Sequence, residues 1–155
     1  MRRRLLCAAA SALLFPLGVA AQAAAPACSV PDHLPPARLS GVWTLTLWPE
    51  GGQETQAQSS GAMLLEPHPE YAGSVRGELK RSGAGNDLQA LVSGDVTEGA
   101  FHLDESEDGQ RISAVWSGTA QDCAGRVEIL GLRRPAEGRH AEPLLRFSLR
   151  RVARW

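Results

Sequence analysis

The side chains best suited to metal or acid–base chemistry are four histidines, which are scattered along the chain. His33, His68 and His140 lie in segments whose turn-forming composition predicts loops, and no pair has the spacing that places two ligands on one face. His102 shares a predicted strand face with Asp104, whose carboxylate could orient the imidazole, but an exposed surface pair is the simpler interpretation. We therefore expect no histidine metal site.

The acidic run Asp104–Gly109 imitates the start of a calcium-binding loop. The positions at which such a loop needs an apolar residue and a closing glutamate hold Arg111 and Val115 instead. The glycine suits a tight acidic turn over Glu105–Gly109, which we prefer to a calcium site. Ser117 lies in a predicted strand and lacks the strand-to-helix context of a catalytic serine. We expect no metal, no cofactor and no catalytic residue, and hence a protein that is not an enzyme.

The first residues predict export. Three arginines at positions 2–4 precede an apolar run at 5–20 and small residues that end in Ala21-Gln22-Ala23. This order is typical of a secretory signal peptide, here residues 1–23, and predicts a periplasmic or secreted protein. Cleavage leaves two cysteines, Cys28 and Cys123, which we expect to form one disulfide in an oxidising compartment.

The predicted mature chain is mildly acidic. Removing the three N-terminal arginines leaves 16 − 3 = 13 basic residues against 17 acidic ones, so the formal charge is 13 − 17 = −4. Domains that bind nucleic acid carry clustered positive charge, and we therefore expect no nucleic-acid partner. A mature length of about 130 residues predicts a single domain.

The elements that must position any site are short strands. Eight segments alternate apolar and polar residues, and most are separated by hairpin-sized turns rich in Gly, Asp and Pro. This pattern predicts an all-β fold, an eight-stranded antiparallel up-and-down β-barrel over residues 39–155, preceded by an extended segment at 24–38. The predicted strands are 40–48, 60–66, 72–81, 88–95, 98–104, 110–119, 126–133 and 144–152.

The apolar faces of these strands identify the residues expected inside the barrel. An eight-stranded barrel is either filled by side chains or holds one small ligand. Gly77, Gly118 and Gly131 also lie on apolar faces, either because they make room for bulky neighbours, which we prefer, or because they border a small cavity. The residues predicted to line the interior, and to contact an apolar ligand there, are Trp43, Leu45, Leu79, Phe101, Ile112, Trp116 and Phe147.

Cys28-Ser29 followed by Gly41-Val42-Trp43-Thr44 resembles the opening of calycin barrels, the lipocalin and avidin group. In calycins a basic side chain of a late strand lies across the first-strand tryptophan, which would assign that role to Arg146 or Arg150. The layout is also similar to that of the secreted alkaline-proteinase inhibitors of bacteria, which are small eight-stranded barrels with one disulfide. Those inhibitors insert an N-terminal trunk into the protease, and residues 24–38 would be the trunk here.

Three functions remain open on the sequence. The preferred one is a non-enzymatic periplasmic or secreted protein that binds a small apolar ligand. The alternative is a protein-binding module or protease inhibitor that acts through the N-terminal segment or the predicted loop at 49–60. The second alternative is a small outer-membrane barrel, but Arg151 interrupts the apolar face of its strand and the strand at 60–66 is too short to span lipid. We therefore expect no stable membrane insertion.

Overall fold

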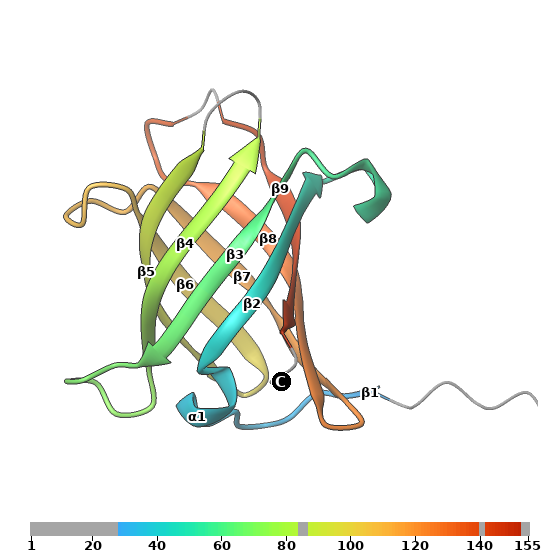
Figure 1. The fold of residues 1–155 in the computed structure, drawn as a ribbon, viewed down its shortest axis with the longest axis vertical. Coiled ribbons are helices and arrows are strands. Elements are labelled where there is room, and N and C mark those ends of the chain that lie inside the picture. The colour runs from blue at the N-terminus through green and yellow to red at the C-terminus, as the bar shows by residue number, and fades with distance from the viewer. Residues whose placement is uncertain (1–27, 84–86, 140–141, 153–155) are drawn as a thin grey trace, which may run out of the picture.

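The computed structural model describes residues 28–83, 87–139 and 142–152. The predicted signal peptide, His140 and the C-terminal Trp155 lie outside these residues. The described chain forms a closed antiparallel barrel of eight strands, β2 to β9, with the short strand β1 added to β7 (Figure 1). The strands are β1 (Cys28–Ser29), β2 (Gly41–Pro49), β3 (Ser59–Pro67), β4 (Val75–Gly83), β5 (Leu88–Thr97), β6 (Ala100–Ser106), β7 (Ala114–Cys123), β8 (Arg126–Pro135) and β9 (Leu145–Arg151).

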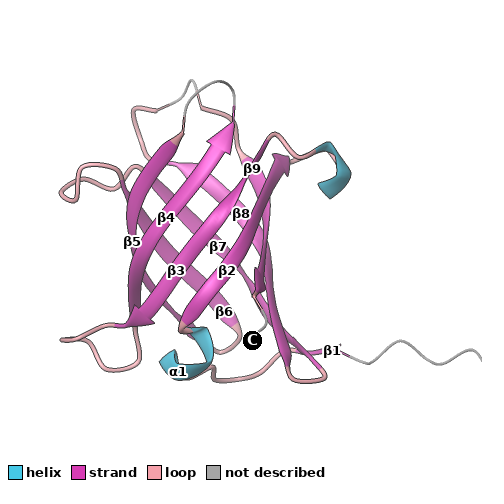
Figure 2. Ribbon diagram, viewed as in Figure 1, coloured by secondary structure: helices cyan, strands magenta, loops and turns pink. Residues whose placement is uncertain are grey.

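The strands follow one another in up-and-down order, as the alternation predicts. Each strand from β2 to β8 pairs with the next, and β9 returns to pair with β2, which closes the barrel and leaves no free sheet edge (Figure 2). Two short helical segments accompany the strands, α1 (Pro36–Leu39) and the 3-10 turn η1 (Glu54–Gln56). At four and three residues, neither of these helical segments in the described ranges reaches across a membrane.

The start of β7 differs from the prediction and changes the place of Ile112. The Asp108 carboxylate accepts the backbone N–H groups of Gln110 and Arg111 at 2.9 and 2.8 Å, which holds this segment as a loop instead of the predicted strand 110–119. Strand β7 begins only at Ala114. The Ile112 side chain is 50% exposed in this loop, so its predicted place inside the barrel is wrong.

The other predicted interior residues lie inside the barrel. Each of these side chains is at most 1% exposed, and any void that admitted a water molecule would leave measurable exposed surface on the side chains around it. The ring of Trp116 meets that of Phe147 edge-on, with centroids 5.0 Å apart. These residues form a packed core, and they are Trp43, Leu45, Leu79, Phe101, Trp116 and Phe147.

Glycines allow this core to close. Phe101, Gly118, Gly131 and Phe147 form one cross-strand row over β6 to β9, and the two phenylalanine rings approach to 6.1 Å between centroids. A Cβ atom on Gly118 or Gly131 would lie 2.4 or 2.1 Å from a carbonyl oxygen of the neighbouring strand. The strands therefore approach too closely here for any side chain, which favours the packing interpretation of these glycines.

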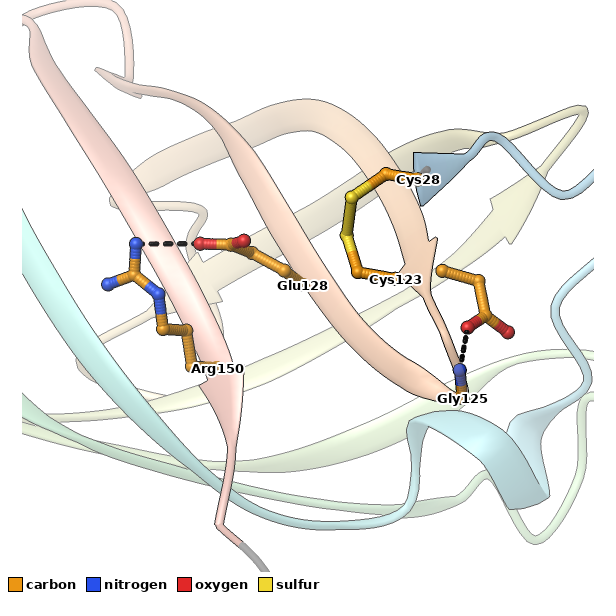
Figure 3. Close-up of a disulfide and its surroundings, with 6 residues drawn as sticks. Cys28, Cys123, Gly125, Glu128 and Arg150 are labelled. Atoms are coloured by element: carbon orange, nitrogen blue, oxygen red, sulfur yellow. Dashed lines mark hydrogen bonds and ion pairs between the residues drawn. A yellow bond between two sulfur atoms is a disulfide. The ribbon is translucent and has the colours of Figure 1, made fainter. Parts of the chain in front are cut away.

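The N-terminal segment covers one end of the barrel. Leu34 and Leu39 are buried there, and the Trp43 indole N–H donates to the Leu39 carbonyl at 2.6 Å. The predicted disulfide between Cys28 and Cys123 is present and ties β1 to the end of β7, with the two Cα atoms 4.2 Å apart (Figure 3). We call this the closed end.

The basic residue opposite Trp43 is Arg151, so the expectation of Arg146 or Arg150 is wrong. In the β2–β9 register, Trp43 pairs with Arg151, whereas the other two arginines have the opposite parity and are exposed. The Arg151 guanidinium donates to the carbonyl of Arg38 at 3.1 Å and also to that of Ser40. It therefore holds the N-terminal segment against the closed end.

A candidate ligand-binding site at the open end of the barrel

Three inward-facing positions of the barrel hold charged residues instead of apolar ones. Arg81 on β4, Glu105 on β6 and Arg133 on β8 each follow the last apolar or glycine residue of an inward face by two positions. Because every second strand of an up-and-down barrel runs the same way, all three lie near the same end, opposite α1 (the upper end in Figure 1). We call this the open end.

Glu105 and Arg133 form a buried ion pair. Their side chains are 0% and 1% exposed, and the guanidinium donates through Nε and Nη2 to both carboxylate oxygens at 2.9 Å. The Trp116 indole N–H donates to the same carboxylate at 2.8 Å. Burial alone would raise the pKa of Glu105, but the hydrogen bonds and charge of Arg133, with the Trp116 hydrogen bond, hold that pKa below its usual value.

A second set of ion pairs surrounds this one nearer to solvent. Glu142 accepts from Arg133 Nη1 at 3.2 Å and from Arg139 Nη1 at 2.9 Å. Arg139 also donates to both oxygens of Glu107, at 2.8 and 3.0 Å, and these bonds raise its pKa. The four side chains, Arg133, Glu142, Arg139 and Glu107, thus pair with one another at the open end.

Arg81 stands apart from this network. Its Nε atom is buried, yet it has no hydrogen-bond partner, and its guanidinium makes no ion pair with any residue in the described ranges. Burial, and then the positive charge of Arg133, lowers the pKa of Arg81, although a guanidinium remains protonated at neutral pH. A buried donor left without an acceptor costs about 1–3 kcal/mol, and within the described residues the Nε–H group of Arg81 is such a donor.

A cavity of about 640 Å³ opens above these residues. That volume lies within the range of pockets for small organic ligands. The cavity has an apolar wall from Leu88, Pro143 and Leu145 and a polar wall from Gln58, Ser59 and Gln89. Arg81 and Arg133 contribute positive charge to the lining, and Asp87, Glu107 and Glu142 contribute negative charge.

The predicted interior residues do not line this cavity. Trp43, Leu45, Leu79, Phe101 and Phe147 fill the barrel below it, and Trp116 adjoins it through its cross-strand neighbour Arg133 and its bond to Glu105. Whether any of these side chains contacts a ligand remains a prediction. The structure therefore separates the packed core from the space that is open to a small molecule.

The sequence analysis did not identify Arg81, Glu105 and Arg133 as site residues, and the reason is identifiable. The expected acidic turn over Glu105–Gly109 included Glu105, whereas β6 runs to Ser106 and buries the Glu105 side chain. The signal in the sequence was the alternation itself. Arg81, Glu105 and Arg133 each stand two positions after an inward residue of their strand, which predicts that they point inward too. An inward charge is costly without a partner, and three of them at one end of a barrel indicate a polar site.

The remaining chemical candidates are elsewhere. The His102 imidazole lies 3.7 Å from the Asp104 carboxylate on the exposed outer surface, beyond hydrogen-bond distance. Among residues 28–83, 87–139 and 142–152, no three His, Cys, Asp or Glu side chains gather in a way that would hold a metal ion. The Asp108 carboxylate of the calcium-like run is occupied by its own loop and by Arg111.

Comparison of the chain with protein-family models, with curated proteins and with solved structures found no match.

Proposed function

We propose that this protein is a non-enzymatic binding protein of the periplasm or the secreted space, and that it holds a small ligand at the open end of its barrel. The observation that carries the proposal is the unmet hydrogen bond of Arg81 in a cavity of about 640 Å³. A site that is complete in the free protein would leave no buried donor unsatisfied. A ligand that accepts from Arg81 would remove this cost on binding.

The packed core supports a ligand at the open end rather than deep inside. Opening space around Trp116 and Phe147 would break close ring contacts and create a void, and voids in packed cores are destabilising. The ion pair of Glu105 and Arg133 lies between this core and the cavity and gives the site a rigid floor. Ligand binding there requires no rearrangement of the strands.

The proposal also places the protein outside the cytoplasm, in water and not in lipid. A disulfide between Cys28 and Cys123 is stable in oxidising compartments, which supports export. The outward face of β4 presents Arg76, Glu78 and Lys80 to solvent, whereas a strand in lipid would present apolar side chains there. Both observations support a barrel that functions in water outside the cytoplasm.

A cavity-filling variant tests the proposal. Leu88→Trp places a large ring in the cavity, and Leu91→Trp places the same ring on the outer face of the same strand, where Leu91 is 52% exposed. A library of small organic molecules would be screened by two-dimensional NMR, and binding would be followed through backbone amides of residues that line the cavity. We expect saturable shifts there in the wild type and in Leu91→Trp, and their loss in Leu88→Trp. Absence of any saturable shift at the cavity, or equal binding by Leu88→Trp, would overturn the proposal.

The alternative function, a protease inhibitor, is limited by the position of residues 28–39. Residues 28–39 are engaged at the closed end through the disulfide, Leu34 and Leu39, so an inserting trunk would have to precede Cys28. A cavity of about 700 Å³ beside Arg38, Arg126 and Arg151 offers a partner a second contact on the same end of the barrel. Inhibition of an alkaline proteinase by the full chain, lost on deletion of residues 24–27, would support this function, and an unchanged protease rate would exclude it.

A further inference from the structure

We propose that the ligand of the open end is a small organic monocarboxylate, and that its carboxylate accepts hydrogen bonds from Nε and an Nη atom of Arg81. This inference rests on the proposed function, because it names the chemistry of the ligand in the same cavity.

Within the described residues, no group accepts a hydrogen bond from Nε of Arg81. Its cross-strand partners are Gly61 on β3 and Leu88 on β5, neither of which has a side-chain acceptor. A larger residue is excluded at position 61, because a Cβ atom there would lie 2.0 Å from the Lys80 carbonyl oxygen. The fold therefore supplies no partner for Arg81 from either adjacent strand.

The contrast with Arg133 indicates what kind of acceptor is missing. Arg133 meets the carboxylate of Glu105 through Nε and Nη2, in the side-on geometry that a guanidinium and a carboxylate share. The buried and unsatisfied atom of Arg81 is the corresponding Nε. Nε has no accessible surface in the free protein, so a ligand carboxylate can reach this edge only if the Arg81 side chain turns it toward the cavity. The carboxylate would then repeat at Arg81 the pairing that the protein already makes at Arg133. A carboxylate offers this edge two acceptor oxygens and a full negative charge, whereas an amide offers one neutral acceptor oxygen, which favours a carboxylate over an amide.

The charge around the cavity limits the ligand to a single negative charge. Asp87, Glu107 and Glu142 are also part of the lining, and they would repel a second charge on the ligand. The apolar wall of Leu88, Pro143 and Leu145 suits an apolar body next to the carboxylate. Inorganic phosphate would be disfavoured on both counts, and a dianion with an apolar body would be disfavoured by its second charge.

Three probes of similar shape separate these possibilities: benzoate, benzamide and phenylphosphonate. Binding to the full mature chain would be measured by NMR titration, with the shifts mapped to the cavity. We expect benzoate to bind about tenfold more tightly than benzamide, and more tightly than phenylphosphonate at a pH where the latter is a dianion. In Arg81→Gln the preference for benzoate over benzamide should vanish, and Arg81→Lys should keep part of it. The matched control is Arg146→Gln, which removes one positive charge from the exposed outer face and should leave the preference unchanged.

The outcomes distinguish this inference from the proposed function. Benzamide that binds the cavity as tightly as benzoate would overturn the carboxylate and leave the proposed function in place. Tighter binding of phenylphosphonate would overturn the single charge. A set of organic probes that never shifts the cavity would overturn the proposed function itself. Thermal unfolding adds an independent check, because Arg81 makes no ion pair, and its Nε no hydrogen bond, within the described residues. Arg81→Gln should unfold at or above the wild-type temperature without ligand, and a clearly lower temperature would mean that Arg81 is structural.

Discussion

At the scale of single residues, the main feature is the contrast between two inward arginines. Arg133 has its charge matched by Glu105 and Glu142, while Arg81 has no partner among the described residues. Both occupy the kind of position at which the rest of the barrel places Leu, Val or Ile. A charged residue at such a core position is destabilising unless its charge is paired. The contribution of each arginine to stability can therefore be tested by measuring unfolding.

Breaking the buried pair should be more harmful than removing it. Arg133→Met leaves the Glu105 carboxylate buried with side-chain hydrogen bonds only from Trp116, at 2.8 Å, and Ser113, at 3.4 Å, among the described residues, and we expect a loss of about 3–5 kcal/mol in the free energy of unfolding. The double variant Glu105→Leu with Arg133→Met should recover most of that loss, because no uncompensated charge remains. Urea denaturation measures both values. Arg134→Met, on the exposed face of the same strand, should change stability by less than about 0.5 kcal/mol.

Stability should depend on pH through Glu105. Because the pKa of Glu105 is lower in the folded protein than its usual value of 4.5, the unfolded state binds more protons between the two values. The contribution of this carboxylate is therefore fully present above about pH 4.5 and is lost as the pH falls through the folded pKa. The difference in unfolding free energy between the wild type and Glu105→Gln should be largest near pH 7 and should shrink below pH 4.5. A difference that stays constant down to pH 2 would contradict this assignment.

At the scale of elements, the close approach of β7 and β8 decides how the core closes. Gly118 faces Gly131 across these strands, and rings from β6 and β9 cover the pair. An aromatic ring that covers a strand glycine replaces the packing that the missing side chain would provide. The row therefore joins four strands into one packing unit.

Gly131→Ala should disturb this row. The new Cβ would lie 2.1 Å from the Ser117 carbonyl oxygen, so the two strands must separate, and we expect a loss of about 1–3 kcal/mol or more. Gly51→Ala is the matched control, because a Cβ at that position meets no atom within 4 Å. Thermal or urea unfolding compares the two, and equal stabilities would show that the strands accommodate the methyl group.

The elements also show what the sequence could and could not predict. Period-two alternation predicted the eight strands of the barrel, because each has one buried face, and the hairpin-sized turns between most of them predicted their order. It failed at the start of β7, where the Asp108 side chain holds a loop through local hydrogen bonds. One sequence does not reveal the inter-strand register. It therefore could not predict which side chains surround Arg81, Glu105 and Arg133.

At the scale of the whole molecule, the barrel has two different ends. The N-terminal segment, the disulfide and Arg151 cover one end, beside a cavity of about 700 Å³, whereas the other end holds the inward charges and the cavity of about 640 Å³. The pairing of Cys28 with Cys123 followed from cysteine count alone, since no other pair survives cleavage of the predicted signal peptide. The polar open end did not follow from any motif.

Removal of the disulfide should lower global stability. Its two cysteines are 95 residues apart, and for a loop of that size chain-entropy estimates and measured removals give a loss of about 2–5 kcal/mol. The variant Cys28→Ser with Cys123→Ser should show this loss by urea denaturation. The wild type in reductant should fall to the level of the variant, and the variant should not respond to reductant. A wild type that ignores reductant would contradict this expectation.

The position of the disulfide also bears on how fast the barrel forms. Closing the barrel brings Trp43 beside Arg151, 108 residues further along the chain. Through the disulfide the connecting path is about 43 residues, 15 from Trp43 back to Cys28 and 28 from Cys123 on to Arg151. The logarithmic cost of loop closure then falls by roughly 0.8 kcal/mol. Topologies dominated by distant pairings fold slowly, so the oxidised chain should refold up to about fourfold faster than the reduced one.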